Sequence, residues 1–327
     1  MNTPVVNERP NSDQRLTGDD PAPAGGLAPR GGLAPRKPRP SRPSLMPYLL
    51  LLPALLAMLL FVYGPALLSL VGSFFTIPLS KGPWKFAGLD NYGSVLGDPL
   101  VQQAAWNTLI YSVATIIPSM VLGLLLALLM ERLGRGGWLA KTALILPMTA
   151  NMVAMAVVFK WIFALQGGLA NQALALVGLA PVNWLGEADT SLATVILVGL
   201  WRATSLCTLL FMAGLTTIPG SIHEATAVEG IRGFAKLRTV ILPMLKPTLV
   251  FVAVLSITGA AQVFEIVHVM TDGGPLGSSE TVMTATNRVG FEYFRVGEAS
   301  ALSFTLIAIL LAVGIIGRGR TRRKEAS

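Results

Sequence analysis

The stretch that decides the fold lies between two long apolar runs, extends from Ser221 to Pro247, and reads SIHEATAVEGIRGFAKLRTVILPMLKP. Ser221, followed three residues later by Glu224, has the spacing of a capping box, which predicts that a helix begins there. Gly230 can adopt the left-handed conformation that ends such a helix after about two turns. Pro243 and Pro247 are expected to bound a second short helix, because proline lacks an amide donor and clashes with the preceding turn. The stretch therefore predicts a short helical hairpin.

Apolar runs long enough to cross a membrane surround this hairpin. Of the 327 residues, 53% are hydrophobic and only 13% are charged, and the mean hydropathy is +0.63. Soluble domains carry about 25% charged residues. Six runs approach the roughly 20 residues that a helix needs to cross the hydrocarbon core, and they cover residues 48–74, 108–130, 142–165, 191–215, 248–270 and 299–317. The sequence predicts an all-α membrane protein with six transmembrane helices.

The basic residues indicate how these helices are oriented. Most of the 25 Lys and Arg residues lie in residues 1–45, 131–141 and 217–247 or after Gly317, and short cytoplasmic loops collect such residues. Both termini are therefore expected in the cytoplasm, and the net charge of +8 needs no nucleic-acid partner. Residues 1–45 are rich in Pro, Gly and Arg, so we expect a disordered cytoplasmic arm. The remaining parts are a membrane domain and a basic cytoplasmic tail, at 46–317 and 318–327.

Few residues suit metal, redox or catalytic chemistry. The chain has one cysteine, Cys207, and two histidines, His223 and His268, which provide no zinc-ligand cluster, disulfide framework or Cys/His nucleophile pair. No Gly-x-x-x-x-Gly-Lys-Ser/Thr phosphate loop occurs. We expect no metal, no cofactor and no catalytic residue, so the chain is not expected to be an enzyme.

The hairpin resembles the EAA loop of ABC importer permeases. Glu-Ala, four residues, Gly, nine residues, then an aliphatic residue, any residue and Leu-Pro follow one another here, at Glu224, Ala225, Gly230, Val240, Leu242 and Pro243. The resemblance implies the type I importer permease fold, with a cytoplasmic EAA loop at 217–247 whose first helix is a coupling helix docked on the ATPase subunit. Thr226, Glu229 and Ile231 stand where alanine, aspartate and alanine are usual. The alternative is an amphipathic helix packed on its own bundle.

Three further segments resemble the sugar branch of these permeases, the maltose and glycerol-3-phosphate type: Phe86–Tyr92, Trp201–Pro219 and Phe264–Pro275. The resemblance implies a permease subunit of the bacterial cytoplasmic membrane that translocates a sugar or related polyol. An extracytoplasmic binding protein would deliver the solute, and the lipid bilayer, a second related permease and an ABC ATPase dimer would be the other partners. The alternative solute is a non-sugar such as glycerol phosphate.

Charged residues within the spans are candidates for the solute path. Arg202 lies well inside the fourth apolar run, where an unpaired cation costs at least about 2.5 kcal/mol, so it is expected to point inward. Glu265, late in the fifth run, can line the path with Arg202 or form a structural ion pair with it. Gln262 and Phe264 suit sugar binding beside Glu265, and their alternatives are a helix-to-helix hydrogen bond and apolar packing.

Two other classes of protein fit the sequence less well. A secondary transporter needs coupling carboxylates near the bilayer midplane and shows repeated broken helices, whereas only Glu265 is available and the two halves show no repeat. A membrane enzyme needs a convergent acid, base or nucleophile, which Arg202, Lys160 and Glu265 do not resemble. Both classes leave the hairpin pattern unexplained.

Overall fold

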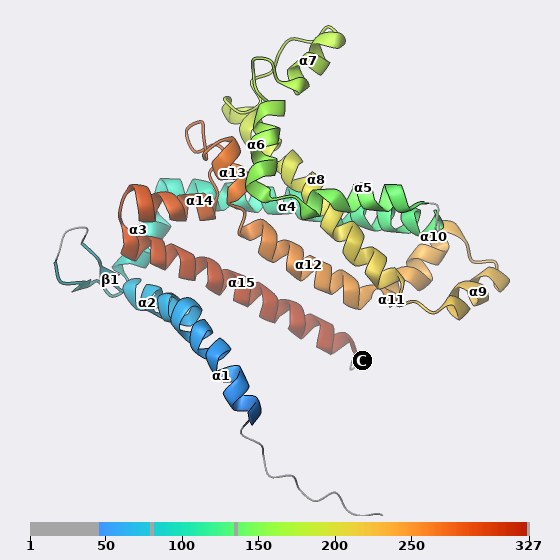
Figure 1. The fold of residues 1–327 in the computed structure, drawn as a ribbon, viewed down its shortest axis with the longest axis horizontal. Helices are drawn as coiled ribbons and strands as arrows, with labels where there is room; N and C mark the ends of the chain where they lie inside the picture. The colour runs from blue at the N-terminus through green and yellow to red at the C-terminus, as the bar shows by residue number, and fades with distance from the viewer. Residues whose placement is uncertain (1–45, 79–81, 134–136, 326–327) are drawn as a thin grey trace, which may run out of the picture. The chain divides into compact units, whose positions relative to one another are not determined.

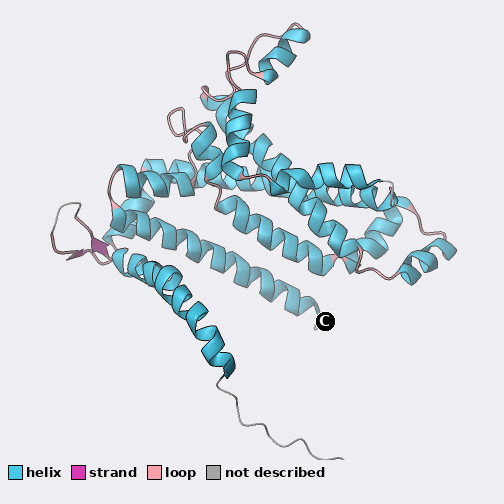
Figure 2. Ribbon diagram, viewed as in Figure 1, coloured by secondary structure: helices cyan, strands magenta, loops and turns pink. Residues whose placement is uncertain are grey.

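The protein is mostly helical in the residues that the computed structural model describes, which are 46–78, 82–133 and 137–325 (Figures 1 and 2). The chain divides after Ala54, and Leu55–Ser327 forms one compact unit. The arm predicted at residues 1–45 lies outside the described residues, as does the end of the predicted tail. The last helix continues as far as Glu325.

The elements follow one another in this order. The first part of the chain contains α1 Met46–Met58, the π-helical turn η1 Leu59–Tyr63, α2 Gly64–Gly72, β1 Phe75–Thr76, β2 Lys85–Phe86, α3 Asp90–Gly97, α4 Pro99–Arg132, α5 Trp138–Thr149, α6 Met152–Ile162, α7 Leu169–Leu176 and α8 Ala188–Leu215. The second part contains α9 Gly220–Val228, α10 Gly233–Lys236, the π-helical turn η3 Leu237–Ile241, α11 Leu242–Met244, α12 Lys246–Ala261, α13 Glu265–Met270, α14 Val282–Asn287, the π-helical turn η4 Arg288–Glu292 and α15 Val296–Glu325.

Five helical stretches of the described chain are long and apolar enough to cross a membrane: Leu49–Gly72, Pro99–Arg132, Ala188–Leu215, Lys246–Met270 and Val296–Ile315. The pair α5 and α6 makes a sixth if the two helices together form one span. These stretches coincide with the six apolar runs of the sequence. The prediction of an all-α membrane protein is confirmed.

The third predicted span is not the continuous helix expected at 142–165. Helices α5 and α6 meet at an angle of 101°. Pro147 lies near the end of α5, and Ala150 and Asn151 then take extended conformations. The Asn151 side chain caps α6 by accepting a hydrogen bond from the Ala154 amide at 3.1 Å. A proline followed by a strong N-cap residue therefore favours a new helix over continuation of the old one.

The fifth predicted span is also interrupted. Helix α12 ends at Ala261 and α13 begins at Glu265, so residues 262–264 between them are not helical. The side chain of Thr281 donates a hydrogen bond to the Val263 carbonyl at 3.1 Å, which satisfies one backbone group that the break leaves free. Two of the spans thus contain a break, and the halves that follow the breaks, α6 and α13, pack against each other.

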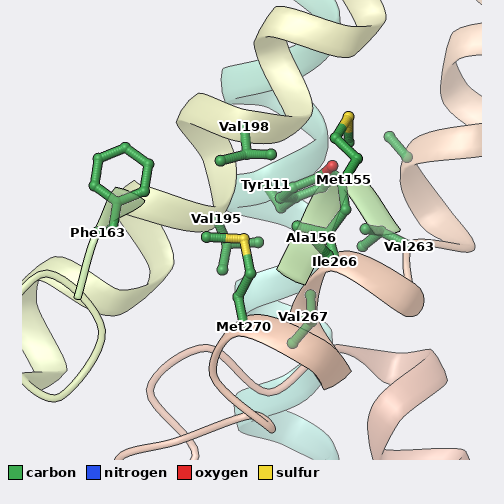
Figure 3. Packing of buried hydrophobic residues seen from close by; sticks show 11 residues of the cluster. Tyr111, Met155, Ala156, Phe163, Val195, Val198, Val263, Ile266, Val267 and Met270 are labelled. Atoms are coloured by element: carbon green, nitrogen blue, oxygen red, sulfur yellow. The ribbon is translucent and has the colours of Figure 1, made fainter. Parts of the chain in front are cut away.

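Buried apolar side chains form three clusters, and α4 contributes to each of them. One cluster joins α4, α6, α8, α12 and α13 around Tyr111, Val198 and Ile266 (Figure 3). A second joins α3, α4, α14 and α15, and a third joins α4, α8 and α12 to the hairpin. Because α4 runs through all three clusters, it fixes the breaks and the hairpin relative to one another.

The segment Phe86–Tyr92, which resembles an outer-loop signature, is fixed to the end of the first span. Strands β1 and β2 pair antiparallel, with Phe75 opposite Phe86. The Asn91 side chain donates hydrogen bonds to the carbonyls of Ser73 and Phe75 at 2.8 and 3.0 Å. These bonds hold the loop against the helix that it follows.

Candidate functional site

A cavity of about 130 Å³, lined by both apolar and polar side chains, lies between α4, α8 and the break in the fifth span. Tyr111, Thr115 and Ser119 line it from α4, and Arg202 lines it from α8. Gln262 and Glu265 line it from the two sides of the break. Because the chain is not helical at residues 262–264, the polar side chains there face a cavity rather than following one helical stripe. The structure thus brings Arg202, Gln262 and Glu265 together.

Arg202 is half-buried, and its Nε atom is buried with no hydrogen-bond partner in the described part of the chain. The structural ion pair with Glu265, one of the two alternatives, is not formed, since none of the ion pairs among the described residues joins these two side chains. Glu265 is exposed at the first turn of α13. Both charged residues therefore line the same cavity without pairing with each other.

Phe264 is not among the residues that line this cavity. Its ring stacks on the His268 ring, with the centroids 5.1 Å apart and the planes 13° from parallel. His268 in turn contacts Asp272, with 2.9 Å between Nδ1 and Oδ1. In this conformation Phe264, the N-cap residue of α13, packs against the side chain of His268 in that helix. This position agrees with the alternative of packing rather than with sugar binding.

Lys160, at the end of α6, connects the two broken spans. Its Nζ atom donates a hydrogen bond to the Val269 carbonyl near the end of α13 at 2.9 Å. A cation at a helix C-terminus satisfies a carbonyl without an intrahelical partner and stabilises the helix dipole. The bond holds the second halves of both broken spans together.

The N-cap of α9, the first helix of the hairpin, lies two residues earlier than predicted. Pro219 is the N-cap residue and no side chain caps the helix, so the predicted capping box of Ser221 and Glu224 is wrong. The predicted end is confirmed: Gly230 has a φ of +72°. The amide of Gly230 bonds to the Ala227 carbonyl at 3.2 Å, and the amide of Ile231 bonds to the Thr226 carbonyl at 2.9 Å. This pair of bonds is a Schellman motif.

The second part of the hairpin is longer than predicted. It runs from Gly233 to Met244 as α10, η3 and α11, so Pro243 lies within the helical segment rather than at its edge. The wide turn η3, closed by a bond from the Leu242 amide to the Leu237 carbonyl, immediately precedes the proline. Only Pro247 bounds a helix, at the start of α12. A π-helical turn changes the bonding register there, so that the chain tolerates the missing donor of Pro243.

The hairpin has a buried side and an exposed side. Leu245 and Ile241 are buried in the cluster with α4, α8 and α12. Glu224 and Ala225 are exposed, and Val228 is 90% exposed at the end of α9. Leu242 is half-buried and Pro243 exposed, beside the anchor.

A buried ion pair that was not predicted from the sequence joins Glu280, in the loop after α13, to Arg288. Glu280 has no exposed surface, and one of its carboxylate oxygens pairs with the Arg288 guanidinium at close range. Arg288 also donates to the Asp272 carbonyl at 2.8 Å and pairs with Glu292 at 3.3 Å. Burial works to raise the pKa of Glu280, against the opposing effect of Arg288. Burial works to lower the pKa of Arg288, but the carboxylates around it outweigh burial and raise that pKa, so the arginine stays charged.

Gly273 makes room for this pair. It has a φ of +75°, which side chains rarely adopt, and a Cβ atom at this position would lie 2.0 Å from the Glu280 carboxylate. The signal available in the sequence is Thr281, three residues before Thr284. The structure forms a capping box between these two side chains at the start of α14. This spacing places the start of a helix directly after Glu280, but it does not reveal the partner of the carboxylate.

Replacing Glu280 by glutamine should lower the unfolding temperature of the purified permease. The change leaves a largely buried guanidinium without its main partner, and breaking a buried pair in this way costs about 3–5 kcal/mol. Glu292→Gln is the matched control, because its side chain is 49% exposed and an exposed pair contributes about 1 kcal/mol at most. Thermal unfolding in detergent measures both variants. Equal losses for the two would show that the buried pair does not hold the loop.

The spans, the breaks and the hairpin together define a multi-span membrane permease. A family model described as "Binding-protein-dependent transport system inner membrane component" matches residues 119–320. That match covers more than half of the chain, and it includes the hairpin and both charged residues of the cavity. The chain belongs to this family.

Two relatives illustrate the range of the family. The chain is 30% identical to the sulfoquinovosyl glycerol transport system permease protein SmoG of Agrobacterium fabrum, over 86% of this chain and 92% of that protein. It is also 30% identical to the trehalose/maltose transport system permease protein MalF of Thermococcus litoralis, over 86% of this chain and 96% of that protein. Both are named as permeases of solute transport systems.

A solved structure has the same fold. One chain of a bacterial ABC transporter involved in the import of the acidic polysaccharide alginate matches with a TM-score of 0.75 and 22% identity. The match covers 85% of this chain and 95% of that chain. The expected fold, that of an ABC importer permease, is confirmed.

Proposed function

We propose that the chain is a transmembrane permease subunit of an ATP-driven ABC importer for a sugar or related polyol. An extracytoplasmic binding protein delivers the solute, a second related permease completes the path, and an ABC ATPase dimer supplies the energy. The chain itself has no enzymatic step. The named solutes of its relatives support the solute class, and the family description supports the binding protein.

The observation that carries this proposal is the group of polar side chains that line the cavity between the spans. Arg202 brings a cation with an unused donor, while Glu265 and Gln262 bring acceptors to the same space. Hydroxyl groups donate and accept hydrogen bonds at once, so a polyol can bond to all three side chains without burying an unpaired charge. A cavity of this composition suits a solute rich in hydroxyl groups.

The hairpin transmits the movement driven by ATP hydrolysis from the ATPase to the spans. Glu224, Ala225 and Gly230 belong to the exposed first helix and its end, whereas Leu242 and Pro243 lie beside the buried anchor. A subunit that moves α9 therefore also moves the buried cluster that joins the hairpin to α4, α8 and α12. The basic residues of 217–247 favour a cytoplasmic position for the hairpin and for both termini. The permease domain is then 46–317, between a cytoplasmic arm and a basic tail.

Reconstitution of the complete importer in liposomes tests the proposal. The solute is first identified by thermal-shift screening of the binding protein against a panel of sugars and polyols. Uptake of that labelled solute should then require the binding protein, ATP inside the liposomes and both permease subunits. Uptake that continues without ATP but stops when an ion gradient is dissipated would identify a secondary transporter instead.

An anionic solute such as a glycerol phosphate is the second candidate, and the unused donor of Arg202 favours it. Glu265 in the same cavity opposes it, because a carboxylate repels an anion in a medium of low dielectric constant. Including glycerol phosphates in the screening panel distinguishes the two solute classes.

A further inference from the structure

A second cavity, of about 620 Å³, lies where the end of α4 meets the hairpin. Leu125, Leu128 and Leu129 form its apolar wall on α4. Arg132 at the end of α4 and Lys236 in α10 bring positive charges to it. Its volume falls within the roughly 300–1,000 Å³ of known ligand sites. It is separate from the cavity of Arg202 and Glu265, with which it shares no lining residue.

The apolar wall and Arg132 lie on one stripe of α4. Residues 125, 128, 129 and 132 follow the spacing of one helix face, at which side chains three or four positions apart are neighbours. Leu125 and Leu129 are more than half exposed although the span contains them. Arg132 is the last residue of that span and lies about 10 Å beyond Leu125 along the axis. The stripe therefore leads from the hydrocarbon region to the level of the lipid headgroups.

The positive charges of this cavity are not neutralised by ion pairs. In the part of the chain that the structure describes, no ion pair includes Arg132 or Lys236. The Lys236 ammonium instead donates a hydrogen bond to Nδ1 of His223 at 3.3 Å. Among the described residues, Glu131 is the one acidic residue of the lining. Two cations against one carboxylate leave a net charge of +1.

We propose that this cavity binds one anionic phospholipid, with its phosphate between Arg132 and Lys236 and an acyl chain along the three leucines. Basic pockets beside transmembrane helices recognise such headgroups. A headgroup with a single negative charge balances the net charge of the cavity, and an acyl chain covers a wall that a free phosphate leaves exposed. The proposal requires only that this end of α4 reaches a lipid interface, so it does not depend on the coupling role of the hairpin.

The lipid contacts both α4 and the hairpin, so it would stabilise the hairpin relative to the spans. His223 belongs to α9, and Lys236 and Leu237 belong to the segment that follows it. Among the described residues, one side-chain hydrogen bond, from Lys236 to His223, joins the two helical parts of the hairpin. A phosphate bound between Arg132 and Lys236 would add a contact that joins α10 to α4.

Native mass spectrometry of the complete importer, purified from membranes that contain phosphatidylglycerol and phosphatidylcholine, tests the proposal. Wild type should retain phosphatidylglycerol in preference to phosphatidylcholine. Arg132→Gln with Lys236→Gln should weaken retention roughly 30-fold, since each basic residue near an anionic surface contributes about fivefold. The matched control, Arg238→Gln with Lys246→Gln, removes the same charge from exposed residues outside the cavity and should retain the lipid.

A second variant guards against misfolding. Leu129→Trp fills the apolar wall without changing any charge and should also expel the lipid. Equal retention by wild type and both cavity variants would overturn the proposal, and so would equal losses in the cavity and control pairs. Displacement of the lipid by inorganic phosphate alone would assign the site to a free anion. If the bound ATPase prevents the lipid from binding, the cavity belongs to the subunit interface.

Discussion

Replacing Glu224 by lysine is expected to abolish ATP-driven uptake while the permease still inserts and assembles with its partner permease. Glu224 is exposed on α9 and makes no ion pair with the other described residues. Its carboxylate is therefore free to contact another subunit. In the proposed assembly that subunit is the ATPase.

The expected loss is large because charge reversal acts on a desolvated contact. Truncating one partner of a buried charge pair at an interface costs about 2–5 kcal/mol, and reversal of the charge adds repulsion. At about 3 kcal/mol, uptake falls more than 100-fold. The helix itself should survive, since lysine has a helix propensity similar to that of glutamate and the Schellman motif at Gly230 is unchanged.

Uptake into proteoliposomes and ATP hydrolysis stimulated by the loaded binding protein measure this effect. Glu229→Lys is the matched control, because it makes the same charge change at the exposed C-cap residue of α9, five residues further on and about 140° around the axis. That variant should keep most of the uptake. Normal stimulation of ATP hydrolysis in Glu224→Lys would show that the coupling role is wrong.

The sequence was sufficient to predict the spans because their signal is local. In the bilayer, a helix satisfies the backbone N–H and C=O groups of about twenty consecutive apolar residues within the segment itself. The positions of the six runs therefore needed no tertiary information. The end of α9 at Gly230 was predictable for the same reason, since a left-handed residue has few substitutes for glycine.

The breaks were not predicted, because one depends on a contact from a distant part of the chain and the other on a local signal that does not always break a helix. The break at 262–264 is supported by Thr281, which bonds to the Val263 carbonyl from another loop. The break after Thr149 had a local signal in Pro147 and Asn151, but prolines within spans often leave the helix continuous, as Pro118 does in α4. Hydrophobic length alone does not distinguish these two cases.

The candidate site was predicted in part. Arg202 and Glu265 stood out as charges within apolar runs, and the structure places both on one cavity. The ion pair between them, one of the two alternatives, is not formed, and Tyr111, Thr115 and Ser119 were overlooked. Those three residues have no distinctive neighbours in the sequence. They join the site because α4 packs on α8.

Replacing Arg202 by alanine should reduce uptake about 10- to 100-fold and leave both ATPase docking and the unfolding temperature unchanged. A hydrogen bond from a charged donor contributes about 1.5–3 kcal/mol, which is lost if the guanidinium contacts the solute. Folding should not suffer, because the buried Nε atom has no partner in the described structure and its removal leaves no group unpaired. Uptake assays and thermal unfolding of the same preparation separate the two effects.

The control variants separate a role in the solute path from a structural one. Arg202→Lys keeps the charge but loses the planar fork, so it should recover part of the uptake and shift the preference among solutes. Lys160→Met removes a different cation near the membrane, one that holds the Val269 carbonyl, and should lower the unfolding temperature without changing that preference. If Arg202→Ala lowers the unfolding temperature and reduces uptake of every solute equally, the arginine supports the bundle rather than the path. A shift in preference at constant stability places its guanidinium in contact with the solute, because a group that only supports the fold cannot favour one solute over another.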